Sequence, residues 1–215
     1  MIEVVSIARD GAPAARAALE RCVHSGGVAL FPADGLYGLA CDPLRAAAIA
    51  RIHALKGRDE SKPSAVMYLS PLVLRELVGG LGDRSREAVA TLLPGAFTLV
   101  LANPDRHYPL ACCEDPERLG VRLIGGPLAG ASCVLFQTSS NRSGQQAPAR
   151  FEDVEPGIAE AVDLAIDGGA LQGSPSTVVD LTEIEHGGAA RLLRVGAASR
   201  SETARLLGEI DIDVA

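Results

Sequence analysis

Two clusters of side chains in this sequence could bind an anion. The first is the basic cluster Lys56, Arg58 and Lys62. Arginine offers a planar fork of donors that fits phosphate or carboxylate oxygens, and lysine adds a point charge. The second is the polar run at residues 138–144 (TSSNRSG), which includes Ser139 and Asn141 and could hold phosphate oxygens. Basic residues also complement a helix C-terminus, and Ser/Asn runs also form ordinary turns, so each cluster alone admits a purely structural explanation.

Single arginines between apolar residues form a third group of candidates. Arg122 lies in GVRLI and Arg194 in RLLRVG. Such residues are commonly solvated on an exposed strand face, but they could also reach over a sheet edge into a cleft. Ser176, directly before an apolar run, could be a turn hydroxyl or a carboxylate binder.

Other catalytic signatures are absent from the sequence. Cys112 and Cys113 are adjacent and no CxxC pair occurs, so no zinc site is predicted. The four histidines show no metal-binding spacing, and there is no GxSxG, GxGxxG or Walker A motif. Nucleophilic catalysis therefore has no support, and no metal ligand is predicted from protein side chains. With 3% aromatic residues and no tryptophan, platforms for stacking single-stranded nucleic acid are scarce.

The composition describes a folded, acidic protein. The 215 residues are enough for one domain, or at most two small ones, and 47% of them are hydrophobic. A net charge of −7 gives no general attraction to nucleic acid or an anionic membrane. Five irregularly spaced cysteines suggest reduced thiols, and no signal-peptide pattern or apolar run of ~20 residues is present. We therefore expect a cytoplasmic protein with no membrane association.

The elements that must position these residues follow from hydrophobic periodicity. Strand 28–31 leads into a Gly-rich loop at 33–38, and Asp42-Pro43 predicts the start of a helix that ends at the basic cluster. Leu44, Ala48, Ile52 and Leu55 would form the buried face of that helix. Further strands are predicted at 2–7, 65–69, 97–101, 119–124, 134–136, 164–166, 177–181 and 192–195. Further helices are predicted at 10–24, 71–78, 83–93, 154–161 and 201–207.

The order of these elements predicts the fold class. Strands and helices interleave, but several strands follow one another through short loops. This favours an α/β fold, an open twisted sheet of mixed parallel and antiparallel strands flanked by helices. We expect one domain at residues 1–208 and a frayed acidic C-terminal tail at 209–215.

Seven short motifs, modest singly but specific in their order and spacing, resemble those of one family. They are PADGLYGL at 32–39, KGRD at 56–59 with KPS at 62–64, PGAFT at 94–98, VRLI at 121–124, TSSNRSG at 138–144, STVVD at 176–180 and LRVG at 193–196. The family is Sua5/YrdC/YciO, best known as threonylcarbamoyl-AMP synthases. The similarity runs from about residue 11 to 197 and implies a YrdC-like fold in the short, single-domain form.

The resemblance implies a nucleotidyltransferase. L-Threonine, bicarbonate and ATP, with Mg²⁺ on the phosphates, would give threonylcarbamoyl-AMP and pyrophosphate for the t6A37 modification of tRNA. Downstream tRNA threonylcarbamoyl transferase proteins would be partners. The residues implied for nucleotide binding are Lys56, Arg58, Lys62, Ser139, Asn141 and Arg194. Those implied for the substrate side are Gly35, Tyr37, Met67, Arg122 and Ser176, with Arg122 as the carboxylate partner.

This chain departs from the family pattern on the amino-acid side. The two loop threonines of the family are Ala33 and Gly35 here, and an expected histidine is Met67. Lost hydrogen-bond partners typically cost about 1–3 kcal/mol each. We therefore predict that ATP binding is kept while threonine is held weakly or replaced by another small amine.

Two alternatives stay open. One is a paralogue that performs the same carbamate chemistry on a different acceptor. The other is an RNA-binding or ribosome-associated module, against which the net charge of −7 predicts weak or no direct binding of nucleic acid.

Overall fold

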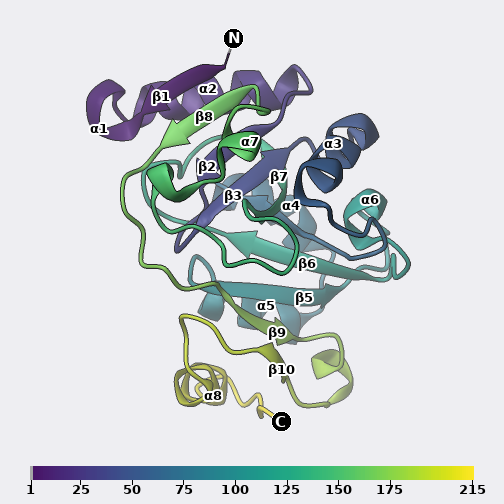
Figure 1. Ribbon diagram of the computed structural model, residues 1–215. Coiled ribbons are helices and arrows are strands. Elements are labelled where there is room, and N and C mark those ends of the chain that lie inside the picture. Colours follow the sequence, from purple (N-terminus) through teal and green to yellow (C-terminus); the bar gives the residue numbers. More distant parts are fainter. Residues whose placement is uncertain (1) are drawn as a thin grey trace.

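The computed structural model describes residues 2–215, which form a mixed ten-stranded sheet flanked by helices (Figure 1). The strand order is β1-β8-β2-β3-β7-β4-β6-β5-β9-β10. The strands are β1 (Glu3–Ser6), β2 (Ala29–Pro32), β3 (Tyr37–Cys41), β4 (Ala65–Tyr68), β5 (Phe97–Ala102), β6 (Arg118–Leu123), β7 (Val134–Ser139), β8 (Leu164–Asp167), β9 (Thr177–Asp180) and β10 (Arg191–Arg194). Pairs β1/β8, β2/β8, β4/β6 and β5/β9 are parallel, and the other neighbours are antiparallel. The predicted open, mixed sheet is confirmed.

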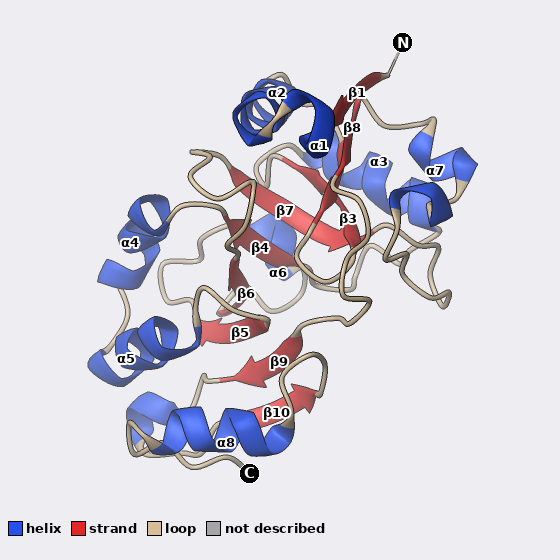
Figure 2. Cartoon of the chain, turned by 90° about the vertical axis from the view of Figure 1, so that its left-hand side faces the viewer, coloured by secondary structure: helices blue, strands red, loops and turns tan. Residues whose placement is uncertain are grey.

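Helices α2, α4, α5 and α8 lie close to where periodicity placed them, whereas the short helices α1 and α6 were not predicted. They are α1 (Ile7–Asp10), α2 (Ala12–His24), α3 (Ala46–Lys56), α4 (Pro71–Gly79), α5 (Asp83–Leu92), α6 (Pro109–Cys112), α7 (Pro156–Ala159) and α8 (Arg200–Gly208), with 3-10 turns η1 (Phe151–Asp153) and η2 (Ile184–His186). The helices α4 and α5 pack against each other and against β4 and β5 (Figure 2).

The start of α3 differs from the prediction. Asp42 accepts a hydrogen bond from the Leu44 amide at 2.8 Å, which forms a local turn, and the helix begins three residues later than expected. Leu44 is consequently 66% exposed, whereas Ala48 and Ile52 are buried as predicted. The Asp-Pro pair is therefore a turn before the helix and not its cap.

A second difference concerns β3, which the sequence analysis did not predict. Its five residues are all buried, and they pair with β2 on one side and with β7 on the other. The strand is short and contains Gly38, so its periodicity is weak. A Cβ at Gly38 would lie 3.0 Å from the Thr138 carbonyl oxygen, which shows how closely the neighbouring strand approaches.

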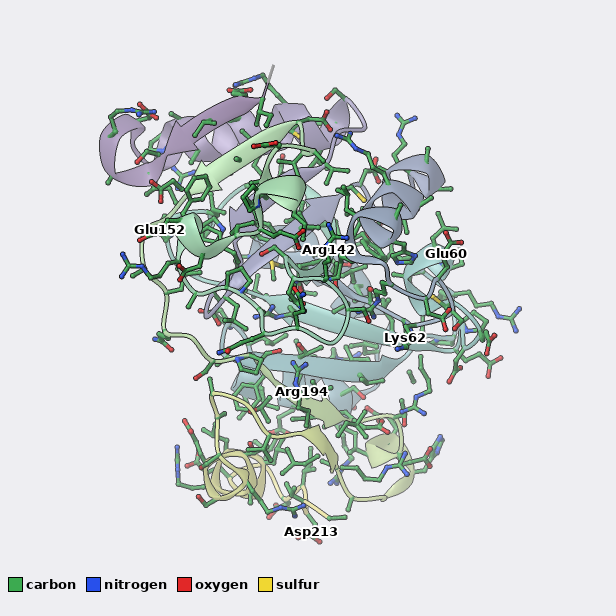
Figure 3. All side chains as sticks on the ribbon, in the orientation of Figure 1. Glu60, Lys62, Arg142, Glu152, Arg194 and Asp213 are labelled. Carbon is green, nitrogen blue, oxygen red and sulfur yellow. The ribbon has the colours of Figure 1, made fainter. Side chains whose placement is uncertain are left out.

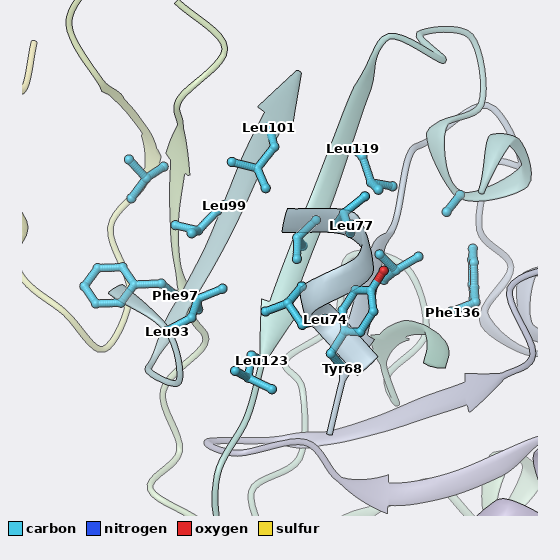
Figure 4. Close-up of a cluster of buried hydrophobic side chains, with 14 of the residues drawn as sticks. Tyr68, Leu74, Leu77, Leu93, Phe97, Leu99, Leu101, Leu119, Leu123 and Phe136 are labelled. Carbon is cyan, nitrogen blue, oxygen red and sulfur yellow. The ribbon is translucent and has the colours of Figure 1, made fainter. Parts of the chain in front are cut away.

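Alternating residues of the strands face two different surroundings. Phe97, Leu99 and Leu101 of β5 and Leu119 and Leu123 of β6 belong to a large apolar cluster with residues of α4 and α5 (Figure 4). On β4, the alternate residue Met67 belongs instead to a second cluster beneath α2. The second cluster includes no residue of β5, β6 or β9 among the described residues, so it covers only part of the other face.

The C-terminal residues are not frayed. Ile212 is 2% exposed, and Val214 forms a parallel bridge with Ala190. The Ala190 amide also donates to the Asp213 carbonyl at 2.8 Å. The expectation of a frayed tail is wrong because apolar residues alternate with the acidic ones and bury against the core.

No helix within residues 2–215 is long and apolar enough to cross a membrane.

Candidate functional site

A cavity of about 770 Å³ lies on the face of the sheet opposite α4 and α5. Its floor comes from the residues that alternate with the large core cluster: Thr98 and Val100 on β5, and Arg118, Gly120 and Arg122 on β6. Loops that follow β2 and β7 and the segment before β9 supply the walls. Of the eleven residues selected from the sequence, the cavity lining includes Gly35, Tyr37, Arg58, Arg122, Ser139, Asn141, Ser176 and Arg194.

Arg58, from the predicted basic cluster, lies at one wall of the cavity. Gly57 ends α3 with a φ of +55°, a left-handed conformation that glycine adopts freely and that reverses the chain direction. Arg58 then donates to the Pro63 carbonyl at 2.9 Å and contacts the Thr138 hydroxyl at 3.4 Å. Its Nε is buried without a hydrogen-bond partner within the described residues, and burial lowers its pKa. Arg58 thus has donor capacity left for a ligand.

The polar loop after β7 forms the adjoining wall. Asn141 donates from Nδ2 to the carbonyls of Arg142 and Gln145, both at 2.7 Å. Its Oδ1 is buried and has no partner in residues 2–215. Ser139 ends β7 beside it. Because unpaired buried polar atoms are costly, Asn141 Oδ1 is a natural contact for a bound donor.

Arg122 is the most deeply buried arginine of the cavity, with 6% of its surface exposed. It contacts Gln137 Oε1 at 3.3 Å and lies 3.8 Å from Asp34, while its Nε has no partner in the described chain. Burial lowers its pKa to about 10, Asp34 opposes this shift and Arg194 adds to it. A buried guanidinium with so few partners is suited to a carboxylate or phosphate, which supplies the missing charge and acceptors.

Ser176 and Arg194 belong to a connected network. Ser176 Oγ lies 2.7 Å from Thr98 Oγ1, and Arg194 donates to the Ser176 carbonyl at 2.9 Å while lying 3.2 Å from its hydroxyl. Burial lowers the pKa of Arg194. Figure 3 shows Arg194 at the centre of the lower half of the molecule and Lys62 further to the right. Arg194 is therefore held in place by Ser176, in the segment that leads into β9.

That entering segment, residues 168–176, crosses from β8 to β9 and is called the strap below. The Gly173 amide donates to the Gly35 carbonyl at 2.9 Å, and a Cβ at Gly35 would lie 2.1 Å from the Ser174 carbonyl oxygen. The Tyr37 hydroxyl donates to the Gly169 carbonyl and accepts from the Gly168 amide, both at 2.9 Å. Gly35 and Tyr37 thus act on the cavity through the strap, and burial raises the pKa of Tyr37 to about 12.

Three of the selected residues lie outside the cavity lining. Met67 is fully buried in the apolar cluster beneath α2, so its side chain is part of the core next to Arg122, its register partner. Lys62 is exposed on the loop beyond α3. Lys56 is 2% exposed and contacts the loop after β7. Burial does not favour the direct ligand contacts predicted for the side chains of Met67 and Lys56, whereas the contact predicted for exposed Lys62 stays a prediction.

The structure also adds residues that sequence reasoning did not select. Asp34, with a left-handed φ of +75°, faces Arg122, and Gln137 contacts the same guanidinium. Arg118 lines the cavity and donates to Asp180, whose side chain is 1% exposed, at 2.6 Å. Asp34 and Asp180 lie within quoted motifs, but their partners come from distant strands and leave no local signal.

Possible metal ligands are few. Residues 2–215 contain no group of three or more His, Cys, Asp or Glu side chains that could hold a metal ion. Among the described residues that line the cavity, Asp115 is the one carboxylate. Magnesium commonly keeps several waters and uses substrate phosphates with one or two carboxylates, so a phosphate-borne ion is compatible with this lining.

Comparisons with known proteins agree with this architecture. The family model named for Sua5, YciO and YrdC, with the description "Telomere recombination", matches residues 21–196. A threonylcarbamoyl-AMP synthase of Chromohalobacter salexigens is 34% identical over 166 residues, covering 74% of this chain and 88% of that protein. The threonylcarbamoyl-AMP synthase of Rattus norvegicus is 31% identical over 234 residues, covering 97% of this chain and 76% of that protein. The crystal structure of P. abyssi Sua5 complexed with L-threonine matches with a TM-score of 0.81 and 26% identity, covering 100% of this chain, which spans 62% of that one.

Proposed function

The chain belongs to the Sua5/YciO/YrdC family, and from this premise we propose that it is a threonylcarbamoyl-AMP synthase. The proposal is that it forms threonylcarbamoyl-AMP and pyrophosphate from L-threonine, bicarbonate and ATP. Relatives carrying this name align over most of the chain, and a relative of similar fold is described in complex with L-threonine. An enzyme is therefore favoured over an RNA-binding module.

One observation carries the proposal at the level of the site. Four arginines line a single cavity in a protein of net charge −7, and burial lowers the pKa of three of them, Arg58, Arg122 and Arg194. Desolvated guanidinium groups require anionic partners, and the residues around them leave the Nε donors of Arg58 and Arg122 unused. A triphosphate and an amino-acid carboxylate would supply these charges together.

The reaction is one of positioning and charge neutralisation. The threonine amine and bicarbonate give a carbamate with loss of water. A carbamate oxygen then attacks the α-phosphorus of ATP, the bond to the bridging oxygen of the β-phosphate breaks, and pyrophosphate leaves with that electron pair. In this proposal, Arg58, Ser139, Asn141 and Arg194 bind the nucleotide. Arg122 would bind the carboxylate, and Ser176 would also lie on the substrate side.

Magnesium would enter with ATP. When bound, the ion neutralises phosphate charge, and the protein's part is to hold the phosphates that carry it. The finer assignments are also proposals: the nucleotidyltransferase class, bicarbonate as co-substrate, and downstream tRNA threonylcarbamoyl transferase proteins as partners. The cytoplasmic location stays a prediction.

Mass spectrometry of the products tests the proposal. The purified chain is incubated with ATP, Mg²⁺, bicarbonate and threonine, and the expected product is threonylcarbamoyl-AMP. Arg58→Ala should lower kcat/KM about 10- to 100-fold, which corresponds to one charge-assisted hydrogen bond, and Arg75→Ala, on the exposed face of α4, is the matched control. Failure of the wild-type chain to make any adenylate with threonine would refute the proposal.

The choice of amine is tested in the same assay. A panel of threonine, serine, valine and glycine shows whether Gly35 and Ala33, in place of the hydroxyl residues of the family pattern, relax the selection. Relative values of kcat/KM decide the outcome. A preference for threonine of more than about a hundredfold over valine would contradict the predicted loss of hydroxyl recognition.

A further inference from the structure

The last residue of β7 and the loop after it, together residues 139–143 and called the loop below, carry two of the proposed nucleotide contacts, Ser139 and Asn141. We propose that Lys56 is a positioning residue that anchors this loop from beneath and acts on nucleotide binding only through it. The identity of the ligand rests on the proposed function, whereas the anchor itself concerns the ligand-free chain.

Both the side chain and the backbone carbonyl of Lys56 contact this loop. Its Nζ donates to the carbonyl oxygens of Ser139 and Asn141, the latter at 2.7 Å, and lies 3.4 Å from Ser139 Oγ. Its own carbonyl accepts from the Ser143 amide at 2.8 Å. Lys56 is the last residue of α3, so these contacts join the end of that helix to the start, middle and end of the loop.

A count of donors separates this role from direct phosphate binding. A lysine ammonium has three N–H groups and no acceptor. The three oxygens around Lys56 Nζ all belong to the loop, and the side chain is 2% exposed and not part of the cavity lining. Arg58, two residues later, is in the opposite situation, with a buried Nε that has no partner in residues 2–215. The basic cluster thus divides into an anchor and a ligand-binding group.

The other side of the loop is held by the backbone of β3. Both the amide and the hydroxyl of Ser140 donate to the Tyr37 carbonyl at 3.0 Å. The loop is therefore clamped between Tyr37 and Lys56. Loss of the ammonium would leave the carbonyls of Ser139 and Asn141 without their buried donor, and the loop would open toward water to hydrate them.

Amide hydrogen exchange of the ligand-free protein tests the anchor without reference to activity. Lys56→Met keeps the length of the side chain and removes its donors, and Arg75→Met is the control for a substitution of an exposed cation. We expect exchange at the Ser143 amide to rise at least about tenfold in Lys56→Met, with amides of β5 and β6 unchanged. Unchanged exchange at Ser143 would overturn the proposal.

Direct measurement of ATP binding tests how the effect reaches the nucleotide. If Lys56 acts through the loop, Lys56→Met and Asn141→Ala should each weaken ATP binding about tenfold. The double variant should then lose clearly less affinity for ATP than the product of the two single losses. For Lys56→Met, the KM for threonine and kcat at saturating ATP should stay within about threefold of wild type. Multiplicative losses would overturn the proposal, because they indicate independent contacts.

A measurement on the unaltered chain makes the test independent of how the variants fold. The sequence contains two lysines, Lys56 and Lys62. Reductive methylation of the native protein should modify exposed Lys62 and leave Lys56 unmodified, with or without ATP. Reaction at Lys56 in the ligand-free protein would overturn the proposal. If the chain binds no ATP at all, the proposed function fails, while hydrogen exchange and methylation still decide the anchor.

Discussion

The contact between Gly35 and the strap should not tolerate a single methyl group. In Gly35→Ala the new Cβ would start 2.1 Å from the Ser174 carbonyl oxygen, whereas ordinary contacts are 3.4–4 Å. The φ of Gly35 lies outside the left-handed region, so alanine is compatible with the local backbone. Steric overlap with the strap is therefore the one new cost.

The size of the effect follows from the required movement. The strap must retreat by about 1.3 Å, the difference between 2.1 Å and the shortest ordinary contact of 3.4 Å. This would stretch the hydrogen bond from Gly173 to Gly35, worth about 1 kcal/mol, and add overpacking of about 1–3 kcal/mol. We expect a free energy of unfolding lower by about 2–4 kcal/mol and a Tm lower by about 4–16 °C for a chain of this size.

Activity should fall by more than stability explains. The strap carries Ser176, which lies 2.7 Å from Thr98 and accepts hydrogen bonds from Arg194. A misplacement of about 1 Å in a reacting site can cost on the order of a hundredfold. At a temperature where the variant is fully folded, we therefore expect kcat/KM for adenylate formation to fall about tenfold to a hundredfold.

Urea denaturation and product formation are measured on Gly35→Ala and on Gly125→Ala. The second variant is the control, because a Cβ at Gly125 meets no atom within 4 Å and its φ is not left-handed. It should be neutral, or more stable by about 0.4–1 kcal/mol through the unfolded state. If Gly35→Ala matches the control in both stability and activity, the strap is not seated on Gly35 and the reasoning is refuted.

Three further predictions concern buried polar groups. Tyr37→Phe removes the hydroxyl that bonds both glycines at the start of the strap, and chemical denaturation should show a loss of about 1–3 kcal/mol; an unchanged midpoint would contradict this. Asp180→Asn leaves two arginine partners without a carboxylate whose side chain is 1% exposed, and should cost about 2–4 kcal/mol in the same assay; a neutral result would show that the pairs contribute nothing. Burial, reinforced by the charge of Arg58, lowers the pKa of Lys56 from 10.5 to about 8. Between these two pH values the unfolded chain binds more protons than the folded one, so the free energy of unfolding should rise with pH. Lys56→Met should lack this rise, and an identical pH dependence of both proteins would contradict the shift.

The sequence by itself determined the class of fold and much of the candidate site. The strand-forming runs at 97–101 and 119–124 identified two interior strands of the sheet, and helical periodicity identified α2, α4 and α5 almost to the residue. Motif spacing selected Arg58, Arg122 and Ser176, which line one cavity. These features are local, because a strand alternates and a helix repeats along the chain itself.

Only the tertiary structure decided what each selected side chain does. Lys56 and Arg58 are two residues apart and similar in charge, yet the left-handed turn at Gly57 leaves the first under a loop and the second at the cavity wall. Met67 and Arg122 are register partners on adjacent strands, but one packs beneath α2 and the other lines the cavity. Their partners come from segments tens of residues away. Because strand pairing and loop packing create these contacts, and neither leaves a trace in local spacing, composition and motif could name the residues without assigning their roles.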